Sequence, residues 1–207
     1  MIVAALFIAV QVTATAPDPR LERLDPETRA IVTAVVDSAC NTGLPAEPLI
    51  QRALEGATKG APGTRIVAAV RRLAADLGVA QTALGSRTTA PELEAAAAAL
   101  RAGATPQLLT KLRDVRRPPL TMALSVLADL VASGVPPDSA STVVLALAPN
   151  ARDADLVEFR RAVERDISLG APPGGAAAVR ALNTGIRSGY TADAAPGQPP
   201  PRPPSRP

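Results

Sequence analysis

The residues that most often carry out chemistry in proteins are scarce in this chain. Its 207 residues include no histidine and a single cysteine, Cys40. A Ser-His-Asp triad, a Cys-His pair, a histidine metal site and a thiolate metal cluster are therefore excluded. No serine is followed three positions later by lysine, and the motifs GxSxG, HExxH and GxGxxG are absent. We expect a non-catalytic protein with no cofactor and no metal site.

The string EGATKGAPGTR, residues 55–65, is the best candidate for an anion-binding loop. Its glycines, with Lys59, Thr64 and Arg65 at the start of a helix, could hold an anion through backbone N–H groups. A Walker loop, however, ends in Gly-Lys-Ser/Thr and follows a strand. Here Lys59 precedes the glycine and a helix precedes the loop, so an ordinary helix–helix loop is the preferred interpretation.

A second basic group consists of Lys111, Arg113, Arg116 and Arg117, with Asp114 among them, at the end of a predicted helix. These side chains could contact an anionic wall polymer, a lipid headgroup or an acidic partner, or they could simply complement the helix dipole. No aromatic residues that would stack on bases lie between them. Because the net charge of the chain is only +3, we expect no nucleic-acid partner.

An acidic group and the lone cysteine complete the candidates for chemistry. Asp153, Asp155 and Glu158 bring three carboxylates together, but their spacing matches no calcium loop, and acids are common in the first turn of a helix. Cys40 could cross-link a dimer in an oxidising compartment. More often, such a cysteine is a small buried apolar side chain, and we predict this role for Cys40.

The elements that position these residues are separated by a recurring stop signal. Glycine closes a helix in the left-handed conformation, an apolar residue packs back on the last turn, and proline opens the next helix. The signal occurs at Gly43-Leu44-Pro45, Gly103–Pro106, Gly134–Pro136 and Gly170–Pro172. Such short connections make neighbouring helices antiparallel, and the spacing resembles that of helix-hairpin repeats, with another hairpin hidden in the long first interval.

Composition and periodicity predict an all-α fold with a core of small side chains, because alanine and leucine favour helices. Residues 66–84 have a clear apolar seam, and residues 120–132, apolar on most faces, are the candidate central helix. We expect about nine helices in antiparallel hairpins, arranged as a solenoid-like array or a compact bundle. They span residues 26–41, 46–56, 64–84, 90–102, 106–115, 120–133, 137–148, 153–169 and 173–184.

The two ends of the chain differ from the helical part. Residues 2–12 are apolar apart from Gln11 and are followed by small residues, which is typical of a secretory signal peptide. An uncleaved apolar N-terminus that docks on the domain is the alternative. The C-terminal end is rich in proline and arginine and cannot build a core. We divide the chain into a signal peptide at 1–14, or to 16, a linker at 17–24, a helical domain at 25–186 and a disordered tail at 187–207.

Two strings, GLPAEPLIQRALEGATKGAPGTRIVAAVRRLA at residues 43–74 and VASGVPPDSASTVVLALA at 131–148, resemble uncharacterised exported Ala/Arg-rich proteins of high-GC bacteria. The resemblance covers most of residues 31–186. It implies export and a helical fold, and it implies no activity.

Together, these features favour an exported, non-catalytic helical scaffold or protein-binding module of the bacterial cell envelope, whose partner is another protein or a peptide. The alternative is an envelope protein that binds anionic polymer or lipid through Arg113, Arg116, Arg117 and the C-terminal tail. A third class, an enzyme built only from carboxylates and arginines, would need a deep cleft with paired acids. We expect no transmembrane segment in the mature chain.

Overall fold

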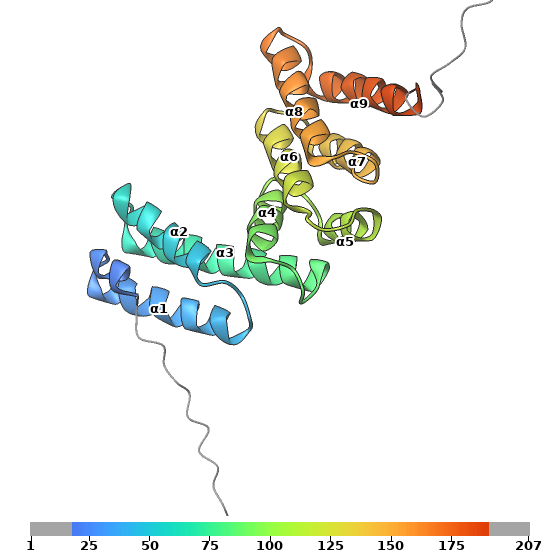
Figure 1. Ribbon diagram of the computed structural model, residues 1–207. Helices are drawn as coiled ribbons and strands as arrows, with labels where there is room; N and C mark the ends of the chain where they lie inside the picture. Colours follow the sequence, from blue (N-terminus) through green and yellow to red (C-terminus); the bar gives the residue numbers. More distant parts are fainter. Residues whose placement is uncertain (1–17, 191–207) are drawn as a thin grey trace, which may run out of the picture. The chain divides into compact units, whose positions relative to one another are not determined.

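The computed structural model describes residues 18–190, apart from the side chains of residues 185–190. All regular structure in this range is helical, which confirms the all-α prediction (Figure 1). The predicted signal peptide, and the predicted tail beyond residue 190, lie outside the described residues. The helices are η1 (Pro19–Arg23), α1 (Pro26–Asn41), α2 (Glu47–Thr58), α3 (Gly63–Leu84), α4 (Ala90–Arg101), α5 (Pro106–Val115), α6 (Thr121–Ala132), α7 (Pro137–Leu147), α8 (Asp153–Ser168) and α9 (Pro173–Tyr190).

The predicted stops are real helix ends. Each of the four glycines has a positive φ: Gly43 (78°), Gly103 (107°), Gly134 (92°) and Gly170 (97°). After the glycine, the next backbone N–H turns back to the last helical turn, as in Leu44 N to Ala39 O and Val135 N to Leu130 O, both 3.0 Å. Leu44 and Val135 are themselves buried. The apolar residue after the glycine therefore seals the end of the helix, as predicted.

The long interval between Gly43 and Gly103 holds two further helix ends. Gly60 and Gly85 also have positive φ, 65° and 96°, and they follow α2 and α3. The hairpin that the spacing predicted in this interval is therefore confirmed.

The described residues belong to two compact units, with the division between Gln81 and Thr82. The sequence places residues 25–186 in one helical domain, and the contacts group its described residues into these two units. The division falls within the last turn of α3, so no linker or change in composition marks it in the sequence. The C-terminal limit also differs, because α9 continues to Tyr190, and residues 187–190 of the predicted tail are helical.

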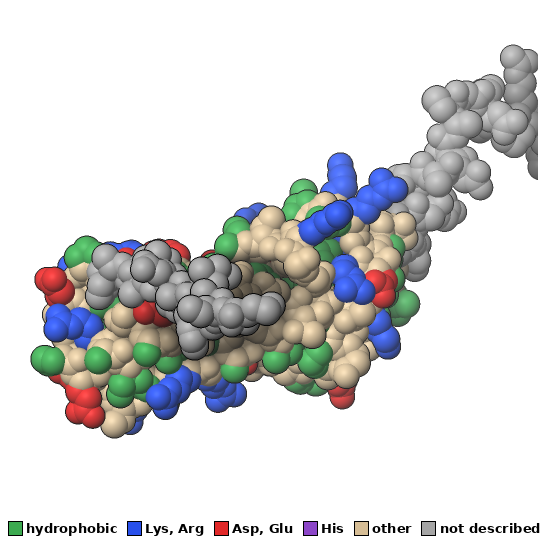
Figure 2. Space-filling model, turned by 90° about the horizontal axis from the view of Figure 1, so that it is seen from below, with side chains coloured by type: hydrophobic (Ala, Val, Ile, Leu, Met, Phe, Trp, Pro, Cys, Tyr) green, Lys and Arg blue, Asp and Glu red, His purple; other side chains and the backbone are tan. Residues whose placement is uncertain are grey.

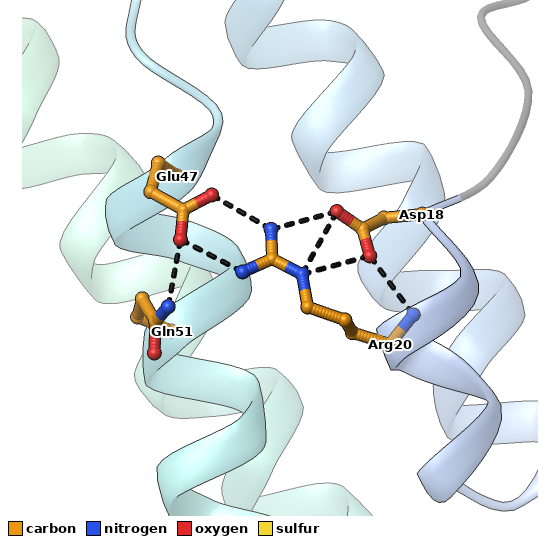
Figure 3. Close-up of polar contacts among 4 residues, drawn as sticks. All are labelled: Asp18, Arg20, Glu47 and Gln51. Atoms are coloured by element: carbon orange, nitrogen blue, oxygen red, sulfur yellow. Dashed lines mark hydrogen bonds and ion pairs between the residues drawn. The ribbon is translucent and has the colours of Figure 1, made fainter.

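The first unit begins with η1, in the segment predicted as a linker. Leu21 of η1 is buried. The guanidinium of Arg20 lies between the carboxylates of Asp18 and Glu47 (Figure 3), and its Nη2 is 2.7 Å from an oxygen of each. The bonds from Arg20 are the main cause that lowers the pKa of Glu47 to about 2. Residues 18–23 are thus anchored on α2, through an apolar contact and an ion pair that the charged, Pro-containing sequence did not indicate.

The second unit is a two-layered array of helical hairpins. The first helix of each hairpin stacks on the next, so that α4 contacts α6 and α6 contacts α8. The second helices form the other layer, in which α5 contacts α7 and α7 contacts α9. Helix α6 also contacts α7 and buries most of its apolar residues, which confirms its central place. This arrangement is the solenoid-like alternative of the predicted fold, within the second unit.

Candidate functional site

The first unit contains an open groove that runs along one side of α1. It has a volume of about 700 Å³. Its floor is formed by successive turns of α1, including Ile31, Val35 and Ser38, and α3 contributes Arg71 and Ala74. Small side chains of α1 between the larger ones, alanine above all, leave the surface hollow. The groove is therefore a property of side-chain size along one helix face.

Helix α1 has two apolar stripes, of which only one is covered. Val32 and Val36 face the core and are 0% and 8% exposed. Ile31 and Val35, each one position earlier, have the same spacing of four, but they are only half-buried and line the groove. A helix that packs on a single core needs one such stripe. The second stripe is therefore apolar surface that intramolecular packing covers only in part.

The polar groups of the groove are few. Arg71 is its only charged lining residue, and it is exposed. The hydroxyl of Thr42, at the end of α1, donates to the carbonyl of Ala39 at 2.8 Å. The other polar side chain among the described lining residues is that of Ser38. Such a lining suits a bound apolar segment, such as one face of a helix from another protein.

The predicted basic group at the end of α5 is partly engaged in contacts within the second unit. Arg116, with an 11% exposed side chain, donates to the carbonyls of Ala148 (2.8 Å) and Ala151 (2.6 Å) and pairs with Asp153. These carbonyls lie at the end of α7 and in the loop after it, where they have no helical partner. Arg116 therefore closes the α7–α8 loop rather than facing solvent.

Its neighbours are placed differently. Arg113 donates to the carbonyl of Ala83 at 3.0 Å and pairs with Asp114, whereas Lys111 and Arg117 are exposed. On the face drawn in Figure 2, basic side chains occur at several separate places among acidic and hydrophobic ones. The sequence therefore grouped four basic residues that the fold divides between internal contacts and solvent.

The predicted anion loop at residues 55–65 connects α2 to α3. Lys59 pairs with Glu55 at 2.6 Å, one helical turn away, and Thr64 and Arg65 are exposed in the first turn of α3. This loop belongs to the first unit and the basic group at 111–117 to the second. The loop has the form of the helix–helix connection that the sequence favoured.

Two of the three carboxylates of the acidic group have partners within their own unit. Asp153 pairs with Arg116, and Asp155 pairs with Arg152 at 2.9 Å. Between residues 18 and 190, no three His, Cys, Asp or Glu side chains come together as metal ligands would. In the same part of the chain, every helix is too short or too polar to cross a lipid bilayer.

The prediction that Cys40 is buried is wrong, because its side chain is exposed. Ala39, the residue before it, is 5% exposed and lies on the core stripe of α1 with Val36. One residue advances a helix by about 100°, which turns Cys40 away from the core. Periodicity could have given this result. Eight residues separate Cys40 from Val32, which turns Cys40 by about 80° around the helix axis and places it at the edge of the core stripe.

Sequence reasoning missed one buried carboxylate. Glu92, 4% exposed, is the only charged side chain that is buried in the described part of the chain. Its Oε2 accepts hydrogen bonds from the backbone N–H and hydroxyl of Thr89, and its Oε1 accepts from Leu120 N at 2.8 Å. Burial raises the pKa of Glu92, but these three bonds outweigh it and lower the pKa. Glu92 thus ties the start of α4 to the start of α6.

Comparison of the chain with protein-family models, with curated proteins and with solved structures finds no match.

Proposed function

We propose that this protein is a non-catalytic binding module whose groove along α1 holds an apolar segment of a partner protein. The observation that carries the proposal concerns the two apolar stripes of α1. Val32 and Val36 are buried in the core, whereas Ile31 and Val35 beside them are half-buried and line the groove. Covering apolar surface contributes roughly 25 cal/mol per Å². A partner that fills the groove would recover this contribution, which the free chain leaves unused.

The shape and charge of the groove define the partner further. Its floor follows about three turns of α1, from Ala30 to the end of the helix beside Thr42, so an elongated segment fits better than a compact ligand. A helix with apolar residues three and four positions apart would place side chains in the hollows above the alanines. Arg71, exposed at the rim, would pair with an acidic residue at one end of that segment.

We also propose that the protein is exported and acts in the cell envelope. This location rests on the apolar segment at residues 2–12 and on the small residues after it. The test is mass spectrometry of the chain recovered from the envelope fraction of its host. A chain that begins after residue 14 or 16 supports export, and an intact N-terminus in the cytoplasm contradicts it.

The binding of anionic polymer or lipid has less support. Arg116 and Arg113, on which this alternative depends, donate to carbonyls of their own unit. Lys111, Arg117 and the arginines of the C-terminal tail remain as candidates. Such contacts weaken steeply as salt rises, because they rest on charge, whereas an apolar groove is nearly indifferent to salt.

The decisive experiment is photo-crosslinking in the native envelope. A crosslinking residue at Ser38, in the groove, is compared with one at Ser86, an exposed position outside the lining. We expect one stoichiometric protein partner from Ser38 and none from Ser86, at both about 0.05 and about 0.5 M salt. Recovery of wall material or lipid alone, lost at the higher salt, would support the alternative.

Two matched variants test whether the groove itself binds. Val35→Arg places a charge in the groove, and Thr33→Arg places the same charge on the same helix outside the lining. Both sites are half-buried, so circular dichroism first checks that the two variants have equal helix content. Loss of the partner with Val35→Arg alone supports the groove, and equal retention by both variants contradicts it.

A further inference from the structure

The hairpins of the second unit have equivalent positions that can be counted from their glycine corners. Gly103, Gly134 and Gly170 each lie three residues before the first residue of the second helix, α5, α7 and α9. Nine residues after each glycine come Leu112, Val143 and Val179. The first two are 1% and 8% exposed, whereas Val179 is 56% exposed. The same place in the repeat is thus buried in two hairpins and open in the last.

The corners themselves show the same break. A Cβ added to Gly103 would lie 3.1 Å from Pro137 of the next hairpin, and a Cβ on Gly134 would lie 3.5 Å from Pro173 of the hairpin after that. At Gly170 nothing lies within 4 Å. Gly103 and Gly134 are therefore each covered by the first proline of the following second helix, whereas no further hairpin follows Gly170 in the described part of the chain.

The outer face of α9 has the character of an interface. Five large apolar side chains are exposed among the described residues, and Leu169, Val179 and Leu182 of this last hairpin are the three most exposed, at 80%, 56% and 68%. Ala178, Val179 and Leu182 are exposed and recur at the spacing of one helix face, whereas Ala176 and Ala177 are buried. A terminal repeat normally has a polar outer face, whereas the described part of this last hairpin exposes large apolar side chains.

The charge of this face favours one kind of partner. Between residues 173 and 184 the only charged side chain is Arg180. It forms two bonds with the carboxylate of Asp166 on α8, at 2.6 and 2.7 Å. Two copies of this described part of the face can therefore meet without like charges opposing each other.

We propose that a second copy of this chain docks on the outer face of α9, so that the two α9 helices pack together about a two-fold axis. Within the array, the surface that covers such a helix is the equivalent helix of the next hairpin, as α9 covers α7. A two-fold contact offers the same surface on both sides and closes after two copies. This dimer contact lies in the second unit and does not depend on the groove along α1.

The test is the association state of the full chain, measured by sedimentation velocity from about 1 µM to about 200 µM. We expect the wild type to shift from monomer to dimer, and Leu182→Glu to weaken the association at least about tenfold. Val115→Glu, at another exposed valine, is the control and should dimerise as the wild type does. Circular dichroism shows that both variants are folded. A wild type that stays monomeric throughout, or a dimer that survives Leu182→Glu, overturns the proposal.

Crosslinking identifies the face that pairs. In a Cys40→Ser background, Leu182→Cys should form an intermolecular disulfide on mild oxidation, and Val115→Cys should not. The competing occupant is the remaining chain after α9, tested by ending the chain at residue 190. If only this shortened chain dimerises, residues 191–207 cover the face in the full chain and the proposal fails.

Discussion

Helices α7 and α9 occupy equivalent places in successive hairpins, yet their surroundings differ. Val143 of α7 is 8% exposed, and Val179 at the same place in α9 is 56% exposed. Helix α7 has α5 and α9 on its two sides within its layer, whereas no helix of the described chain follows α9 in that layer. One sequence pattern thus produces core where a next hairpin exists and an open apolar face where it does not.

Helix α1 of the first unit presents a third situation. Its stripe of Ile31 and Val35 is neither covered, as in α7, nor fully open, as in α9, but lies in a groove with walls. Walls restrict what can bind, whereas an open helix face accepts any flat apolar counterpart. This difference is why we assign the groove to a partner of defined shape and the α9 face to a second copy.

The largest contrast is expected between identical substitutions at equivalent positions. Val143→Asp buries a carboxylate without a partner and should lower the free energy of unfolding by about 3 kcal/mol. Val179→Asp should change it by less than about 0.5 kcal/mol, because the new charge stays in water. Urea denaturation of both variants, at a concentration where the wild type is monomeric, makes the comparison. Similar losses in the two would show that α9 is covered in the monomer.

Two neighbouring arginines offer the next contrast. Arg116→Met leaves the carbonyls of Ala148 and Ala151 without their donor, which should cost about 2 kcal/mol. Arg117 is exposed, so Arg117→Met should remain within about 0.5 kcal/mol of the wild type. Thermal unfolding followed by circular dichroism gives both values. If Arg117→Met were the more damaging substitution, the assignment of Arg116 to the α7–α8 loop would be incorrect.

A third pair of variants compares two carboxylates at the third position of a helix. Glu92 lies in α4, in the first hairpin of the second unit, and Asp155 lies in α8, in the last. Glu92 bonds Leu120 at the start of α6, whereas Asp155 caps only its own helix, through Arg152 N at 2.9 Å. Glu92→Gln should therefore cost about 1.5 kcal/mol at neutral pH, and Asp155→Asn should cost less.

The pH dependence of the stability that Glu92 and Asp155 contribute follows from the direction in which their pKa values are shifted. The pKa of Glu92 and that of Asp155 are both lowered in the folded chain. Each carboxylate therefore stabilises the fold above its unfolded pKa, about 4.3 for Glu and about 3.9 for Asp. The contribution is lost as the pH falls through the folded pKa. The difference in the free energy of unfolding between wild type and Glu92→Gln should therefore shrink as the pH falls below about 5. A difference that grew there would contradict the role of the Glu92 carboxylate as an ionised acceptor.

The smallest difference between paired variants is expected at the glycines that end the helices. Alanine at Gly103 or Gly170 meets the same backbone penalty, because both glycines have φ near 100°, and we expect about 1 kcal/mol for each. Gly103→Ala also forces its Cβ against Pro137 at 3.1 Å, so it should cost a few tenths more, roughly 0.5 kcal/mol. Chemical denaturation of the two variants tests this order, and a more damaging Gly170→Ala would mean that the last corner is covered.

Helix positions were predictable because their signals are local. Gly134, Val135 and Pro136 act on the two helices that they separate, through φ, a buried contact and a missing N–H. The predicted helices agree with the observed ones to within about two residues, apart from the C-terminal end of α9. The division in α3 and the burial of η1 depend on distant contacts, and they were not predicted.

The candidate sites were predicted less well, for the same reason. Arg116 and Arg117 are adjacent and chemically identical, and only the place of the α7–α8 loop makes one of them a structural donor. The groove could have been anticipated from the pairs Ile31-Val32 and Val35-Val36, which mark two stripes on one helix. The sequence does not say which stripe the core will cover.

By itself, the sequence determined that this chain is helical, where its helices end, and that histidine and thiolate-cluster chemistry are excluded, since these follow from composition and from interactions a few residues apart. The tertiary structure decided which equivalent residues are buried. Whether Val143 or Val179 is covered depends on whether another helix lies beside it, and burial is set by neighbours in space rather than by neighbours in the chain.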